Sequence, residues 1–377
     1  MIYLDYSATT PVSKDVLDSY VKVTKEYIGN PNSLHSLGER SKELLDSATN
    51  QICELLNIKE SELIYTSGAT ESNNLAIIGY ALKNQKKGKN IVVSKLEHPS
   101  VYGICDYLST LGFTITYVNN TDDGVIDFDD LRSKVTKDTL MVCIVGVNSE
   151  MGIRQPLKTL RQIIKKENEN TVLFSDFTQA IGKINVNLHD VDLASISSHK
   201  IYGPKGIGLL YKSEKVNIEP IIRGGSGEQR GGTPSLPLIV AFSKALRIAV
   251  SGVTKNEGIV KLLNDKLRTT IAKYPEIKIN KTNYSIPHIL NISLMNIKPE
   301  TFIHALEKRD IYVGSNTACS HGKSSQAVMA VYNDKKRAET TIRISLSHLT
   351  SFDDINKFLY SFDIVYNKLN ELGGPHE

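Results

Sequence analysis

The stretch that decides the fold is DLASISSHKIYGPKGIG, residues 192–208. DLASISS has the composition of a buried β-strand, and it ends directly in His199 and Lys200 before the chain turns through Gly203-Pro204. A charged lysine is costly to bury at a strand end inside an α/β core. It is tolerated there when it forms a Schiff base or has a lowered pKa. Taken alone, Lys200 is better explained as a surface lysine on a loop.

Helices and strands alternate along the chain before this stretch. Amphipathic helices are predicted at 16–28 and 40–57, and further helices near 73–83, 102–111 and 157–166. Strands are predicted at 62–66, 90–95, 113–118, 140–147 and 171–176. Strands separated by helices favour right-handed crossovers and a mostly parallel sheet covered on both faces. Such a sheet places its chemistry at the carboxyl ends of its strands.

The remainder of the chain has a different pattern. RGGSGEQRGGTPSLP (223–237) is rich in Gly and Pro and predicts a long functional loop. Two helices are predicted after it, at about 237–251 and 257–273, followed by strands at 288–294 and 341–347 and a helix at 299–308. We therefore expect an α/β protein with two domains: a large domain over 14–253, and a smaller α+β domain formed by 1–13 and 254–377.

Composition excludes several classes of protein. The 377 residues are 40% hydrophobic and 23% charged, which is ordinary for a folded chain. The net charge of +4 gives no reason to expect a nucleic-acid partner. The longest apolar run, 140–147, is far shorter than a membrane span needs, and no signal-peptide pattern is visible. The four cysteines form no CxxC motif, so we expect a cytoplasmic protein with reduced thiols and no metal site.

Two further strand ends carry chemistry. The apolar strand in TVLFSDFTQAIGK (171–183) ends in Asp176, and an acid there needs a cation such as the protonated pyridine nitrogen of pyridoxal phosphate (PLP). Alone, Asp176 is equally well explained as a turn cap. TSGATESNN (66–74) opens a helix straight after a strand, which suits phosphate but is a weak signal alone. Together, the phosphate cradle, the carboxylate and the lysine predict a PLP site.

With these motifs in place, the sequence resembles the cysteine desulfurases of the NifS/IscS kind, within the class V aminotransferase group of fold-type I PLP enzymes. The resemblance runs nearly end to end. Its matching pieces are YLDYSATTP (3–11), GNPNSLH (29–35), TSGATESNNLAI (66–77), SKLEHPSV (94–101), DFTQAIGK (176–183), SSHKIYGPKGIG (197–208), RGGT (230–233), GSNTACS (314–320) and TIRISLS (341–347). It implies a fold-type I large domain built on a seven-stranded sheet.

The resemblance also implies a role for each residue that would hold the cofactor. Lys200 would bind the PLP aldehyde covalently, Asp176 would keep the pyridine nitrogen protonated, and Gln179 would touch the phenolic oxygen. His98 would stack on the ring and assist proton transfer. The phosphate would be held by Ala69, Thr70, Ser197 and His199. Thr233 would reach the phosphate of the other subunit's cofactor, which implies a homodimer.

Substrate binding and sulfur transfer follow from the same resemblance. The substrate, L-cysteine, would be bound by Arg343, Ser149 and Asn32. Cys319 would be the nucleophile that takes its sulfur as a persulfide, which leaves L-alanine. An acceptor protein, an iron–sulfur scaffold or a tRNA thiolation enzyme, would then receive the sulfur. The other cysteines, in QICELL, YGICDYL and LMVCIVGV, lie in apolar segments and are expected to fill the core.

Two departures from the family pattern leave alternatives open. Residues 147–152 are VNSEMG, so Ser149 stands where the family has an asparagine that bonds cofactor and substrate. The loop between Glu228 and Arg230 is also shorter than usual. Another class V PLP enzyme (an aminotransferase, a selenocysteine lyase or a β-lyase) therefore stays possible, and Cys319 would then be incidental. A degenerate homologue that acts only as a binding partner has Ser149 alone in its favour.

Overall fold

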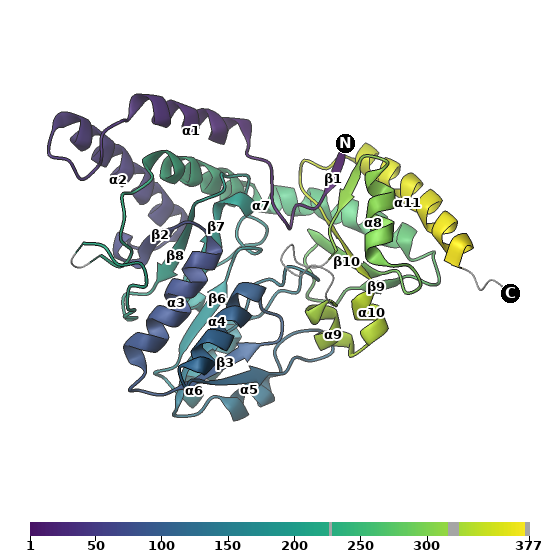
Figure 1. Cartoon of the computed structure of the whole chain (residues 1–377), viewed down its shortest axis with the longest axis horizontal. Coiled ribbons are helices and arrows are strands. Elements are labelled where there is room, and N and C mark those ends of the chain that lie inside the picture. Colours follow the sequence, from purple (N-terminus) through teal and green to yellow (C-terminus); the bar gives the residue numbers. More distant parts are fainter. Residues whose placement is uncertain (226–227, 316–323, 374–377) are drawn as a thin grey trace.

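A seven-stranded sheet lies at the centre of the larger half of the molecule (Figure 1). The computed structural model describes residues 1–225, 228–315 and 324–373. In spatial order the strands are β2 (Leu63–Thr66), β8 (Gly208–Lys212), β7 (Leu193–Ser197), β6 (Val172–Asp176), β5 (Thr139–Cys143), β3 (Asn90–Ser94) and β4 (Thr114–Val118). Only β8 runs antiparallel to its neighbours, β7 and β2. The expected mostly parallel, seven-stranded sheet is confirmed.

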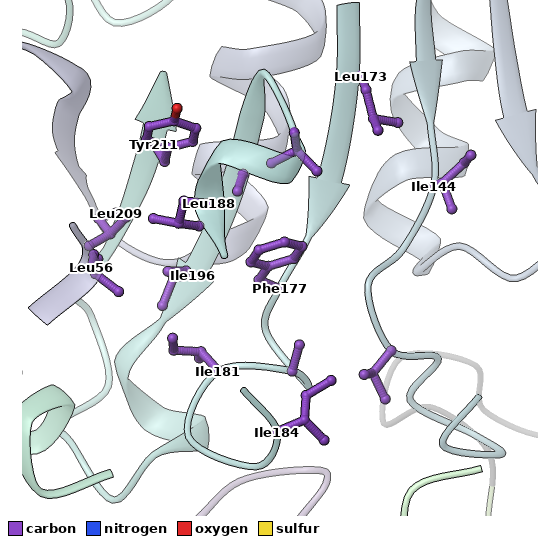
Figure 2. Packing of buried hydrophobic residues seen from close by; sticks show 14 of the residues in the cluster. Leu56, Ile144, Leu173, Phe177, Ile181, Ile184, Leu188, Ile196, Leu209 and Tyr211 are labelled. Atoms are coloured by element: carbon purple, nitrogen blue, oxygen red, sulfur yellow. The ribbon is translucent and has the colours of Figure 1, made fainter. Parts of the chain in front are cut away.

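Helices cover both faces of this sheet, so its central strands are apolar on both sides. On one face lie α3 (Ala69–Asn84) and α4 (Pro99–Thr110); on the other lie α2 (Ser36–Leu56), α5 (Phe128–Lys134), α6 (Leu157–Glu167) and part of α7 (Leu236–Ile271). Neighbouring residues alternate between the faces: Leu173 packs in one cluster and Phe174 in the other. Figure 2 shows Leu173, Ile196 and Leu209 in the first cluster with Leu56 of α2.

Helix α7 is one continuous helix of 36 residues, so the expectation of two helices at 237–251 and 257–273 was wrong. Gly252 and Gly258 lie inside it, and each costs about 1 kcal/mol relative to alanine. Packing outweighs this cost: the first half of α7 contacts α1 (Lys14–Glu26) and α2, and its second half lies in the core of the smaller half of the molecule. The helix therefore passes straight through the predicted domain boundary at 253/254 and joins the two halves (Figure 1).

The same helix contains an apolar stretch of 18 residues. Of the helices in the described ranges, only α7 is long and apolar enough to cross a membrane by length and composition. Half of that stretch is buried against the rest of the protein, which is typical of a core helix.

The smaller half has its own apolar core. Its strands are β9 (Lys278–Asn280), β10 (Ile289–Ser293) and β12 (Thr341–Ser345) in an antiparallel sheet, and β1 (Ile2–Leu4) paired in parallel with β11 (Ile311–Val313). Its helices are α8 (Pro299–Glu307), α9 (Gln326–Tyr332), α10 (Lys335–Glu339) and α11 (Phe352–Gly373). The pairing of β1 with β11 places Ile2–Leu4 beside this half of the molecule. The exact division at 13/14 and 253/254 stays a prediction.

Candidate functional site

A cavity of about 590 Å³ lies at the carboxyl ends of the central strands. This volume is ordinary for a small-molecule or cofactor site. The N-terminal segment contributes residues 7–9 to its wall. Ten of the predicted site residues also line it: Ala69, Thr70, His98, Ser149, Asp176, Gln179, Ser197, His199, Lys200 and Arg343. Residues that are far apart in the sequence thus meet where the strand-end rule places them.

Lys200 lies in a short 3₁₀ helix, Ser198–Lys200, directly after β7. Its Nζ donates to the backbone carbonyl oxygens of Ser7 at 2.5 Å and Ala8 at 2.7 Å. His199 is held by the same N-terminal segment, through a hydrogen bond of 3.1 Å between its Nδ1 and Thr9 Oγ1. Burial, helped by nearby lysines, lowers the pKa of His199 to about 4, so its ring is neutral at pH 7.

Asp176 ends β6 and is buried. Its Oδ2 accepts from Asn73 Nδ2 at 3.1 Å, and its Oδ1 accepts from the backbone N–H of Thr178 at 2.8 Å. In the described part of the chain no basic side chain forms an ion pair with it. A buried carboxylate held by two neutral donors is suited to pair with a cationic group in the cavity. Asn73 was not predicted, although it lies within the TSGATESNN motif.

The start of α3 is open toward the cavity. Gly68 is its N-cap and has no side-chain capping bond, and residues 67–70 all line the cavity. A Cβ on Gly208 would lie 2.8 Å from the Cα of Gly68, so glycine lets β8 pass close to this turn. The free N–H groups and the positive end of the helix dipole make an anion site, and a phosphate group fits it.

His98 caps α4 and faces the same cavity. The backbone N–H of Ser100 donates to its Nδ1 at 3.2 Å, so the proton of the neutral ring lies on Nε2. Burial lowers the pKa of His98, and the charges of Lys200 and Arg343 lower it further while Asp176 opposes them. The ring is therefore a neutral group that can accept a proton within the cavity.

Arg343 lies in the middle of β12 and is only 2% exposed. Its Nη2 donates to Asp5 Oδ1 at 2.9 Å, and its Nη1 donates to the backbone oxygen of Ser149 at 3.0 Å. Its Nε has no hydrogen-bond partner among the described residues. A buried guanidinium held in this way keeps donor capacity for a carboxylate. Asp5 was missed because nothing in the sequence marks it as a partner of Arg343.

The structure decides whether Asn148 can replace the family asparagine at position 149. Asn148 is buried, its Nδ2 donates to the backbone oxygen of Leu96 at 3.0 Å, and its Oδ1 accepts from the N–H groups of Glu150 and Met151. Both ends of its amide therefore take part in shaping the turn. Only the shorter side chain of Ser149 is left on the cavity wall.

Three predicted residues are not placed in the cavity. Thr233 lines a neighbouring hollow of about 540 Å³, which shares Ser67 and Gly206 with the cavity. Asn32 is exposed on the loop between α1 and α2 and is not part of the cavity wall. Cys319 lies outside the described residues. The roles assigned to all three stay predictions.

The remaining cysteines are buried, as expected. Burial raises the pKa of the Cys105 thiol to about 12, and it raises the pKa of the Cys53 and Cys143 thiols as well. Thiols of this kind are unreactive near neutral pH, because the thiolate is the nucleophile.

The comparisons with known proteins decide the family. The model of the family described as "Aminotransferase class-V" matches residues 2–358. The chain belongs to the class V aminotransferase family. A relative from Buchnera aphidicola subsp. Baizongia pistaciae, the cysteine desulfurase IscS, is 38% identical over 98% of this chain and 93% of its own length. The family is PLP-dependent.

Solved structures of the family have the same fold. A NifS-like protein matches with a TM-score of 0.92 and 32% identity, over 98% of this chain and 100% of its own. SspA in complex with cysteine matches with a TM-score of 0.80 and 28% identity, over 93% of this chain and 100% of its own. The resemblance to fold-type I cysteine desulfurases of this family is thereby confirmed.

Proposed function

We propose that the chain is a PLP-dependent cysteine desulfurase that converts L-cysteine to L-alanine and passes the sulfur to an acceptor. One observation carries this proposal: Lys200, Asp176, His98, Arg343 and the open N-terminus of α3 line a single cavity. The cysteine desulfurase name of its full-length relatives supports the same reaction. An enzyme without this chemistry would have no reason to bring a lysine, a buried carboxylate and an anion site together.

The cavity fits PLP at each of the cofactor's polar groups. The N-terminus of α3 and Ser197 would hold the phosphate, Asp176 the pyridine nitrogen, and Gln179 the phenolic oxygen. When bound, the cofactor supplies an electron sink that stabilises negative charge at the substrate α-carbon. The protein's part is to place Lys200 next to the aldehyde and to exclude water from the reacting atoms.

The protein's own residues would then carry the proton and sulfur transfers. Arg343 holds the substrate carboxylate, which fixes the α-carbon near Lys200. The Lys200 amine would then remove the α-proton. The Cys319 thiolate would attack the substrate sulfur, so that a sulfur–sulfur bond forms on Cys319 while the C–S bond breaks. The electron pair of the C–S bond would stay with the carbon skeleton, which takes up protons and leaves as alanine. His98, whose pKa is lowered by burial, would relay a proton.

The described ends of the segment that carries Cys319 are tied to this site. Gly314 and Arg343 exchange backbone hydrogen bonds of 3.0 and 2.7 Å. On the other side, Ser325 is buried and donates from its Oγ to Glu150, the residue after Ser149. Both contacts thus involve Arg343 or the neighbour of Ser149, the residues proposed to bind the substrate carboxylate. This supports a role for Cys319 as the sulfur carrier.

The same proposal includes a homodimer, a cytoplasmic location and a protein acceptor for the sulfur. Thr233 lies beside the cavity and not in its wall, as expected of a residue that serves the partner subunit's cofactor. An iron–sulfur scaffold or a tRNA thiolation enzyme would receive the sulfur. Mixed dimers of Lys200→Ala and Thr233→Ala chains test the dimer, because such a dimer contains one site with neither defect. Activity above that of the unmixed variants supports sharing across subunits, and no gain contradicts it.

The cofactor part of the proposal is tested by chemical trapping. Purified protein is incubated with PLP, reduced with borohydride, digested and mapped by mass spectrometry. The label is expected on Lys200 and absent in Lys200→Ala. Lys205 lines the same cavity, so Lys205→Ala is the matched control and keeps the label. A label on Lys205 or on surface lysines only, or no label, contradicts the proposal.

A further inference from the structure

A buried lysine that the proposed reaction does not use lies directly behind the cavity. Lys183 is only 8% exposed. Its Nζ donates to Gln179 Oε1 at 2.7 Å. Gln179 Nε2 in turn donates to the backbone oxygen of Ser7 at 2.9 Å, the same oxygen that accepts from Lys200. A chain of hydrogen bonds thus joins Lys183 to the cavity wall through Gln179.

This arrangement fixes which way the Gln179 amide points. The backbone oxygen of Ser7 can only accept, so the atom of Gln179 that faces it is Nε2, and the atom that faces the donating Lys183 is Oε1. The NH₂ group is then turned to the other side, where one hydrogen meets the Ser7 oxygen and the second is left for the cavity. Without a donor at position 183, the Ser7 oxygen alone would hold the amide in this orientation, so the amide would be less firmly fixed and could rotate to present its oxygen to the cavity.

Stability alone does not account for Lys183. Among the described residues it forms no ion pair, and its one hydrogen bond is to a neutral amide. Burial, with the charges of Lys200 and Arg343, lowers the pKa of Lys183 to about 7. A buried lysine of this kind costs folding free energy, and replacing it with an apolar side chain of similar length is often neutral or stabilising. Residues that reduce folding stability in this way are expected at functional sites.

We propose that Lys183 is a positioning residue, which holds the Gln179 amide with its NH₂ toward the cavity so that it donates to the phenolic oxygen of the bound cofactor. This inference rests on the proposed function. It also predicts a spectroscopic effect. A donor at the phenolic oxygen competes with the proton on the neighbouring lysine-linked nitrogen, so loss of that donor makes the nitrogen easier to protonate.

A second buried lysine provides a matched control. Lys212 is 5% exposed, and its Nζ donates to the backbone oxygen of Val216 at 3.0 Å. It lies in β8 and does not line the cavity. Replacing it removes a buried ammonium and one hydrogen bond, as at Lys183, but has no effect on Gln179.

The test compares Lys183→Met, Lys212→Met, Gln179→Leu and the Lys183→Met/Gln179→Leu double variant. The visible absorbance of the lysine-linked cofactor is titrated with pH, and kcat and KM for L-cysteine are measured. For Lys183→Met we expect the titration midpoint to rise by about one pH unit. We also expect kcat to fall about 10-fold with KM nearly unchanged, as for loss of a ring contact. Lys212→Met should match the wild type in both readouts.

The double variant shows whether Lys183 acts through Gln179. If it does, the double variant behaves like Gln179→Leu alone, because the two changes remove one interaction. Lys183→Arg keeps a donor and should keep the wild-type midpoint. An unchanged midpoint in Lys183→Met, or effects that add in the double variant, overturns the inference. A wild-type protein that forms no lysine-linked cofactor contradicts the proposed function instead, so the two failures are distinguishable.

Discussion

The ring side of the cavity (Asp176, Gln179, Lys200 and the start of α3) and its carboxylate side (Asp5, Ser149 and Arg343) are assembled differently. Every residue of the ring side ends a strand of one sheet or lies shortly after one, and the hydrogen bonds of that sheet fix its position. The carboxylate side depends on contacts between three distant parts of the chain. Asp5 is 338 positions from Arg343, and Ser149 is 194. The rule that functional residues lie at the carboxyl ends of parallel strands therefore predicts the ring side, but it does not identify which residues meet on the carboxylate side.

The largest expected effect comes from the ring side. Asp176→Asn keeps the shape of the side chain but removes its charge. We expect kcat to fall by about 10²–10⁴-fold, the range typical for loss of a positioned proton partner. KM for L-cysteine should change little, because the substrate carboxylate binds on the other side. Steady-state kinetics check this, and a change mainly in KM would show that the two sides are not separable.

On the carboxylate side, Arg343→Lys keeps the charge but loses the planar fork. We expect kcat/KM to fall about 10- to 100-fold, as for the loss of one charge-assisted hydrogen bond, mostly through KM. The cofactor spectrum should be unchanged. A loss confined to kcat, or an altered spectrum, would mean that Arg343 acts on the ring side instead.

Ser149→Asn restores the amide that the family has at this position. Because the amide of Asn148 is already used, the new side chain should add about one hydrogen bond and lower KM about 3- to 10-fold. Thermal unfolding should be unchanged, since Ser149 lines the cavity. No improvement in KM or kcat would indicate that the serine serves a different substrate.

The smallest effect at neutral pH is expected at His288, which is 5% exposed and immediately precedes β10. Burial, then Lys183 and His348, lower its pKa from 6.5 to about 3. The unfolded chain therefore binds this proton first, so stability is lost as pH falls from about 6.5 toward 3, by an order of a few kcal/mol. Denaturant unfolding of His288→Phe should show a flatter acid slope than wild type.

The exposed His304→Gln is the control for that experiment, because its side chain is 71% exposed and its replacement should leave the slope unchanged. An acid slope in His288→Phe as steep as that of the wild type would assign the loss of stability to other groups.

Particular residues show which features of the fold and the site can be predicted from the sequence and which cannot. Apolar runs located six of the seven strands of the large sheet, because a strand buried on both faces needs them. The seventh, β8, was not predicted, and it runs antiparallel to its neighbours. Two helices were predicted where α7 is a single helix. Glycine at position 252 is unfavourable inside a helix, yet packing on both halves keeps the helix whole. Helix α5 was missed although its cap, Asp127, accepts from two N–H groups of the first turn. The contact of Asp5 with Arg343 could not be predicted from the sequence, because only the folded chain brings these two residues together.

The reaction products test whether this chain is a desulfurase that uses Cys319. L-cysteine is incubated with the PLP-loaded protein and a reductant, and alanine and sulfide are measured for wild type, Cys319→Ala and the buried-thiol control Cys53→Ala. We expect alanine and sulfide in equal amounts from wild type and from Cys53→Ala, with little of either from Cys319→Ala. Equal behaviour of wild type and Cys319→Ala, whether active or inactive, would contradict the assignment of this chain as a desulfurase that uses Cys319.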